Sequence, residues 1–136
     1  MAKAEHPPAR EYNLLITPTF DEREMVYKTL VELKTKQQFS TFRYELSVDE
    51  QLTGKTLRLK VRGLTPPQRS LPGAGPARFS RKYDGLNGTC EVSVEGLDGK
   101  VNAFSVRISP KKVVLVKSPR SRFVDLVTDQ TLWPND

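Results

Sequence analysis

The stretch "TLRLKVR", residues 56–62, alternates strictly between aliphatic or small side chains and cationic ones. Its aliphatic members are Leu57, Leu59 and Val61, and its cationic members are Arg58, Lys60 and Arg62. Successive side chains of a strand point to opposite faces. The stretch therefore predicts a β-strand with one buried face and one basic face.

The same two-residue period continues on both sides of this stretch. Its apolar positions upstream are Phe42, Tyr44, Leu46 and Val48, and those downstream are Cys90, Val92, Val94, Phe104, Val106 and Ile108. We expect a hairpin that joins the upstream strand to residues 56–62, and a second turn at Asp98-Gly99. Two more strands are predicted at Val113–Val116, buried or at an edge, and at Phe123–Val127.

The N-terminal part of the chain carries mixed signals. Tyr12–Ile16 predicts a short strand that Thr17-Pro18 stops, because proline cannot donate to a ladder. Asp21 and Glu24 then have the spacing of a capping box. With apolar residues at Val26, Leu30 and Leu33, they predict a helix from Glu22 to about Lys36. The β-branched Thr29 and Val31, with the alternation around Tyr27, leave a strand as the alternative.

These elements together predict an α+β, mainly β, fold of six or seven strands. We expect an antiparallel sheet that forms a small barrel or sandwich, with the single N-terminal helix packed on it. Residues 1–10 are expected to be a flexible arm, and residues 11–136 a single domain. Within it, residues 64–85 are rich in Pro, Gly and Arg and predict one long loop, either mobile or bound to a partner.

The 136 residues include one cysteine, Cys90, so no disulfide can form within the chain and no four-cysteine zinc site exists. The first twelve residues have no apolar segment of the kind a signal peptide needs. The longest purely aliphatic run, Val113–Val116, is too short to span a membrane. A cytoplasmic location is the expectation.

The net charge of +6 is unevenly distributed. Residues 51–83 hold eight basic and no acidic side chains, and residues 99–124 hold seven basic and no acidic ones. The intervening residues 84–98 hold four acids and no base. Two acid-free basic blocks predict binding to an anionic partner.

The sequence offers few candidate catalytic side chains. The single histidine, His6, lies in the predicted arm, and Cys90 falls on the apolar phase of its strand, so it is expected to be a small buried side chain. "GAGPAR", residues 73–78, begins like a dinucleotide fingerprint but has arginine at its sixth position and no helix signal after it. We predict a protein that is not an enzyme, with no metal and no cofactor.

The best candidate site is a basic surface. Its predicted partner-binding residues are Arg43, Arg58, Lys60, Arg62, Arg69, Arg78, Arg81, Lys82, Lys111, Lys112, Arg120 and Arg122. Arginine-rich surfaces suit bidentate contacts to carboxylate or phosphate. The competing interpretation is that these are solvated outer positions, since lysine and arginine also protect strand edges from aggregation.

Three partners are compatible with this surface. The first choice is an acidic protein surface in a larger assembly, for which the chain would be an accessory subunit. The second is the backbone of RNA or single-stranded DNA, although most aromatic residues fall on the apolar phase and only Phe79 and Tyr83 lie near the cations. The third is an apolar ligand inside a small barrel. Leu132 and Trp133 could anchor a partner or pack back on the domain's own core.

Overall fold

The alternating stretch at residues 56–62 forms the first seven residues of a ten-residue β-strand in the computed structural model, which describes residues 11–39, 44–65 and 75–133. The strands are β1 (Tyr12–Asp21), β2 (Val26–Phe39), β3 (Glu45–Thr53), β4 (Thr56–Thr65), β5 (Gly75–Tyr83), β6 (Gly88–Glu95), β7 (Val101–Ser109), β8 (Lys112–Lys117) and β9 (Val124–Val127). A single turn of 3-10 helix, η1 (Gln130–Leu132), follows β9. The fold is all-β.

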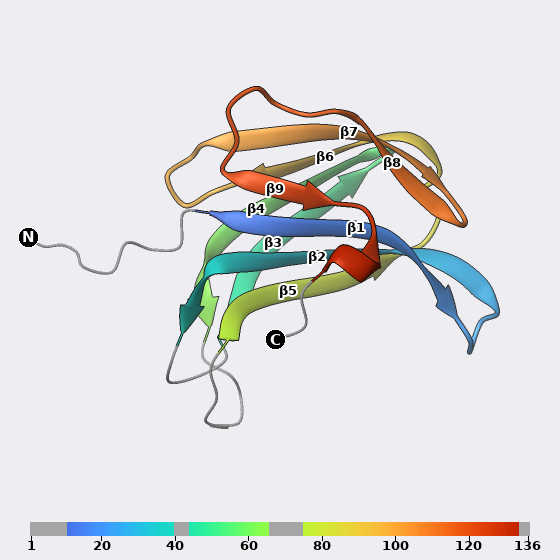
Figure 1. Ribbon diagram of the computed structural model, residues 1–136, viewed down its shortest axis with the longest axis horizontal. Helices are drawn as coiled ribbons and strands as arrows, with labels where there is room; N and C mark the ends of the chain where they lie inside the picture. The colour runs from blue at the N-terminus through green and yellow to red at the C-terminus, as the bar shows by residue number, and fades with distance from the viewer. Residues whose placement is uncertain (1–10, 40–43, 66–74, 134–136) are drawn as a thin grey trace, which may run out of the picture.

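The nine strands form one sheet in the order β8-β7-β6-β4-β3-β5-β2-β1-β9, which curls into a half-barrel (Figure 1). Most neighbours are antiparallel, but β1 with β9, β3 with β5, and β4 with β6 are parallel. The predicted hairpin between the upstream strand and residues 56–62 is confirmed as β3 and β4, and it turns at Gly54-Lys55. The predicted turn at Asp98-Gly99 joins β6 to β7.

The hydrophobic core lies on the concave face of the curled sheet. Every strand contributes at least one buried apolar side chain to a single cluster. Strand β4 contributes Leu57, Leu59 and Val61. Cys90 belongs to this cluster and is 2% exposed, as its phase in the strand predicted. The curl is what allows one sheet to bury its apolar face, because inward side chains of distant strands meet each other.

The predicted helix from Glu22 to Lys36 is wrong, because these residues form the turn after β1 and most of β2. Asp21 does accept hydrogen bonds from the backbone N–H groups of Arg23 (2.9 Å) and Glu24 (3.1 Å). An N-cap residue makes the same bonds, so the local signal at Asp21 is shared by a helix start and a β-turn. The residues that follow the turn decide between them.

After the turn, the chain enters β2 with a period of two. Val31 and Leu33 lie in the core with the buried Thr29, whereas Leu30 points to the opposite face, so the apolar spacing that resembled a helix is split between both faces. β-branched residues fit a strand better than a helix. Ladders with β1 on one side and β5 on the other outweigh the capping signal.

Strand β1 does not stop at Thr17-Pro18 as predicted but continues to Asp21. Pro18 pairs with Thr29 of β2 in register, while β9 pairs only with Tyr12–Leu15 of β1. Proline is tolerated where its missing N–H faces no ladder partner. Pro18 lies on the part of β1 that β9 does not reach, which explains why the strand survives it.

The predicted loop at residues 64–85 is also shorter than expected. Leu64 and Thr65 belong to β4, and residues 75–83 form β5, which pairs with β2 along most of its length. Residues 66–74 lie outside the described residues, as does the predicted arm at 1–10. Within the described ranges, the structure holds no apolar helix of the length that a bilayer crossing requires.

The segment after β9 packs on the convex face of β2. The Trp133 indole Nε1 donates to Glu32 Oε1 (2.9 Å), and the Lys34 ammonium lies 4.3 Å from the centre of the Trp133 ring. Figure 1 shows η1 crossing in front of β1 and β2. Trp133 does pack back on the domain, but on this convex face and not on the core as the alternative expected, and Leu132 is 72% exposed.

The β1–β2 turn provides a test of the corrected fold. Met25 has a φ of 58°, which is the left-handed conformation that costs an L-residue about 1 kcal/mol. Its side chain is 70% exposed, so replacing it removes little packing. We expect Met25→Gly to leave the free energy of unfolding unchanged or to raise it by up to about 1 kcal/mol. In a helix interior the same change would destabilise by a similar amount, and urea denaturation distinguishes the two.

Candidate partner-binding surface

Strand β4 presents its three cations on the convex face, as its alternation predicted. Arg58, Lys60 and Arg62 are all exposed. Two of them, however, have acidic neighbours on the adjoining strands: Lys60 Nζ lies 3.9 Å from Glu95 of β6, and Arg62 Nη1 lies 3.4 Å from Asp49 of β3. The basic stripe of β4 is therefore partly neutralised by the sheet itself.

The cations of β5 do not share one face. Arg78 forms an ion pair with Glu32 of β2 (3.3 Å), while Arg81 forms one with Glu50 of β3 (2.7 Å). Arg78 and Arg81 are three residues apart in the strand, so their side chains point to opposite faces. Lys82 is exposed. The structure thus brings the predicted β4 and β5 cations into contact with acids more than with one another.

Glu50 is the centre of a small polar cluster at the edge of the core. Besides the ion pair with Arg81, it accepts a hydrogen bond from the Tyr83 hydroxyl. Arg81 also lies 5.3 Å from the centre of the Phe79 ring. Burial, then the hydrogen bond and the charge of Glu50, raise the pKa of the Tyr83 hydroxyl well above its usual range. The cluster joins β3 to β5 by side chains.

Such side-chain contacts matter because β3 and β5 share a single registered pair, Glu45 with Arg78. An open cavity of about 520 Å³ lies between the two strands. Its lining includes Leu46, Val48 and Phe79 from the core face and Ser47 and Ser80 from the opposite face. A cavity lined from both faces is a gap in the wall of the sheet, not a pocket on its surface.

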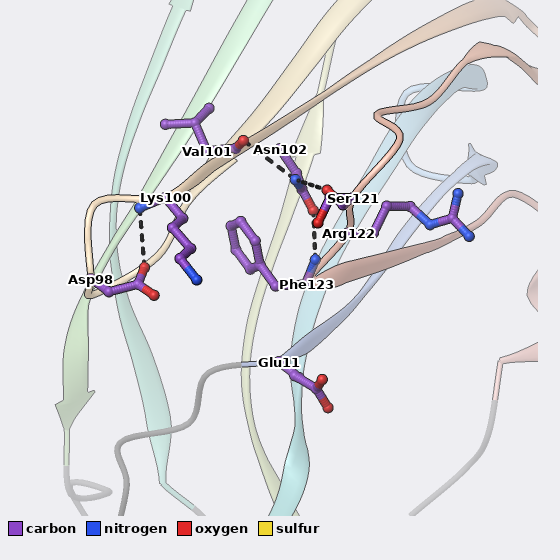
Figure 2. Close-up of a pocket in the computed structure, with 8 residues that line it drawn as sticks. All are labelled: Glu11, Asp98, Lys100, Val101, Asn102, Ser121, Arg122 and Phe123. Atoms are coloured by element: carbon purple, nitrogen blue, oxygen red, sulfur yellow. Dashed lines mark hydrogen bonds between the residues drawn. The ribbon is translucent and has the colours of Figure 1, made fainter.

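A second open cavity, of about 480 Å³, lies where β7 meets the segment before β9 (Figure 2). Asn102 of β7 is 4% exposed and links the two. Its Oδ1 accepts from the backbone N–H groups of Phe123 (2.9 Å) and Val124 (3.2 Å), and its Nδ2 donates to the carbonyl of Ser121 (3.0 Å). Glu11, Asp98, Lys100 and Arg122 line the cavity with charges of both signs. The hydrogen bonds of Asn102 join β7 to the start of β9.

The cations of β7 and β8, at one end of the sheet, differ from those of β4 and β5 because they have no acidic partners in the part of the chain that the structure describes. Within the described residues, no ion pair is found for five exposed cations of β7, β8 and their turns: Arg107, Lys111, Lys112, Lys117 and Arg120. We call these five residues the β7–β8 cationic surface. Strand β8 is the last of the sheet, and β7 on its other side carries no acid. On the other side of β7, β6 carries Glu91 in register with Ser105, but among the described residues no ion pair joins it to any of the five cations.

Exposed aliphatic side chains lie among these cations. Val114, Leu115 and Val116 of β8 are 41%, 41% and 51% exposed, whereas Val113 is buried against the core. Leu115 is in register with the fully buried Val106, so it belongs to the core phase and yet remains open to solvent. The combination of an apolar edge strand with unpaired cations is the most distinctive surface of the described chain.

The remaining predicted residues are placed as follows. Arg122 lies 3.9 Å from Asp125 and is only weakly paired. Arg43 and Arg69 lie outside the described residues. Sequence reasoning named Lys111, Lys112 and Arg120 of the cationic surface, but not the aliphatic residues of β8 as part of it. Their consecutive run was a signal, since Val113–Val116 breaks the alternation seen elsewhere.

No protein-family model matches the chain, and neither the curated proteins nor the solved structures include a significant match to it. The described residues contain no cluster of three or more metal-ligating His, Cys, Asp or Glu side chains.

We expect Asn102→Ala to lower the free energy of unfolding by about 2–3 kcal/mol, because it leaves buried backbone groups of the segment before β9 without partners. Asn87→Ala is the matched control, since Asn87 is exposed, and it should change stability by less than about 0.5 kcal/mol. Chemical denaturation of both variants measures the difference. Equal stabilities would contradict the anchoring role of Asn102.

The raised pKa of Tyr83 predicts a pH dependence at the alkaline end. The protonated hydroxyl is favoured by the folded state, so its contribution is complete below pH 10, the ordinary tyrosine pKa, and declines as pH rises above that value. In Tyr83→Phe, we expect stability to be about 1–2 kcal/mol lower at neutral pH. The same variant should show a shallower decline above about pH 10, measured by urea denaturation across the range. An unchanged slope would contradict this assignment.

Proposed function

We propose that this protein is a non-catalytic binding module that docks an acidic protein surface of a larger assembly through the β7–β8 cationic surface. The observation that carries the proposal is the presence of exposed, unpaired cations around an exposed aliphatic strand. Clustered cations of one sign attract an oppositely charged partner and orient its approach. The exposed aliphatic side chains supply apolar area that charges alone do not.

The neutralisation of the other basic block supports this choice of surface. Lys60, Arg62, Arg78 and Arg81 already have carboxylate partners within the sheet. A partner that binds them must compete with these ion pairs. In the described chain, the cations of the β7–β8 cationic surface have no ion pairs that a partner would have to replace, so they are the better candidates for contact with an external acid. Arg58 and Lys82 remain as exposed cations that could extend the contact.

Nucleic acid is the alternative partner, and the position of the aromatic residues counts against it. Phe79 and Tyr83, the aromatics nearest to the predicted basic loop, are only 8% and 9% exposed. Single-stranded nucleic acid is commonly held by stacking on exposed aromatic rings among cations. Among the described residues, the β7–β8 cationic surface has aliphatic side chains in that position. The apolar-ligand alternative is disfavoured by the core cluster, which fills the concave face.

We also propose a cytoplasmic location, and Cys90 supports both this location and the non-catalytic role. This thiol is packed in the core, where it behaves as a small apolar side chain. A single buried free thiol is compatible with a reducing compartment. The proposal therefore assigns binding, and not chemistry, to the exposed surface.

The test uses defined polyanions: poly-glutamate as the acidic polypeptide, and oligo-dT and oligo-U as nucleic acids. Replacing Lys111, Lys112 and Lys117 with serine should weaken poly-glutamate binding about tenfold at low salt, since exposed charge contacts contribute a few tenths to 1 kcal/mol each. Binding of the wild-type chain should also weaken as salt is added. Fluorescence anisotropy titrations measure both effects.

The matched control replaces Arg58, Lys60 and Arg62 with serine, which removes the same number of charges from β4. This variant should bind poly-glutamate nearly as well as the wild type, because most of those cations are already paired. If the β4 variant loses binding and the β8 variant keeps it, the docking surface belongs to β4. Tighter binding of oligo-dT or oligo-U at about 0.15 M salt, where weak surface charge contacts are screened, would support the nucleic-acid alternative.

A further inference from the structure

We infer that β8 binds its partner by strand addition, pairing its free edge with an extended segment that has an aliphatic centre and acidic ends. This inference rests on the proposed function and specifies the structure of the partner. Strand β8 ends the sheet, and every second residue of an edge strand points its N–H and C=O away from its one neighbour. Such a row of backbone groups is a template for another strand.

The side chains of β8 fit this mode of binding better than they fit a free surface. Natural edge strands are usually short, bulged or charged, which prevents unwanted pairing. Strand β8 is short, has Lys112 and Lys117 at its ends and is bulged at Val116, where its register with β7 shifts. Residues 113–115, however, are uncharged and in regular register with β7, so this part of the edge has neither a charge nor a bulge to prevent pairing. Val114, Leu115 and Val116 are consecutive and exposed, so aliphatic side chains are open on both faces of the strand. An added strand would cover both faces together.

The free edge of β8 is not covered by the other end of the curled sheet, which leaves an opening between β8 and β1. The curl brings β8 near β1, yet no ladder joins them. Strand β9 occupies the edge of β1 only along Tyr12–Leu15. Leu115, although in register with buried Val106, is exposed at this opening. A strand added to β8 would extend the apolar face over Leu115.

The lysines determine which occupant fits. If two copies of β8 paired antiparallel about Val114 and Leu115, Lys112 of each copy would lie opposite Lys117 of the other. Like charges directly opposite each other destabilise a strand pair. A segment with Asp or Glu at both ends places opposite charges at the same positions. The charge pattern therefore favours an acidic partner over a second copy of this chain.

The experiment uses a short synthetic peptide with valine and isoleucine at its centre and a pair of acidic residues at each end. We expect saturable binding to the full chain, with slower hydrogen exchange of the β8 amides at residues 113–116. A second peptide has the same side chains but is N-methylated on alternate residues, which removes the hydrogen-bond donors of one edge. It should bind at least about tenfold more weakly.

Two protein variants test whether the Leu115 side chain contributes to peptide binding independently of the charges. Leu115→Ser should weaken binding of the acidic peptide while poly-glutamate binding persists. Val101→Ser is the matched control because Val101 is also an exposed aliphatic residue, on the part of β7 that does not pair with β8. Equal binding of the methylated and unmethylated peptides would overturn strand addition and leave the charge-based proposed function intact. Failure of the acidic peptide to bind, or a dimer protected from exchange at β8, would also overturn the inference. If the wild-type chain shows no salt-dependent binding of poly-glutamate, that result would instead count against the proposed function.

Discussion

A single β-sheet has to bury its apolar face, and this requirement organises the rest of the structure. With no second sheet and no α-helix among the described residues, the sheet covers that face by curling, so that Leu57 and Val92 in the middle of the sheet share one core with Tyr12 and Val124 near one end. The curl has two consequences. It leaves β8 as a strand edge near β1 without a ladder, and it lets β3 and β5 separate after their single registered pair.

Neighbour relations within the sheet decide which charges are available for binding. The basic block at residues 51–83 and the acids at residues 84–98 are separated in the sequence, but the β4–β6 pairing places Lys60 beside Glu95. Acids of β3 and β2 approach Arg62, Arg78 and Arg81 of that block. The second basic block lies at the end of the sheet, where no acidic strand follows. Two blocks of similar composition therefore differ in their freedom to contact a partner.

The same reasoning explains which predictions succeeded. The strands at residues 45–65 and 88–109 could be predicted because each needs only a local alternation of apolar and polar side chains, which the ladder then uses directly. The helix at Glu22–Lys36 failed because Asp21 makes the same hydrogen bonds in a β-turn as at a helix start, and long-range ladders on both sides of β2 decided the outcome. Of the candidate surface, Lys111, Lys112 and Arg120 could be named from charge alone. The exposure of Leu115 could not, because its phase predicts burial.

The sequence by itself determined the alternating strands at residues 45–65 and 88–109, the inward phase of Cys90 and the presence of two acid-free basic blocks, since all three follow from residue types a few positions apart. Strand order, the closure of the core by curling and the pairing of Lys60, Arg62, Arg78 and Arg81 with acids were decided only by the tertiary structure. The physical reason is that each of these depends on which strands become neighbours. That choice is made by the burial of the whole apolar face, and it is not encoded in any one segment.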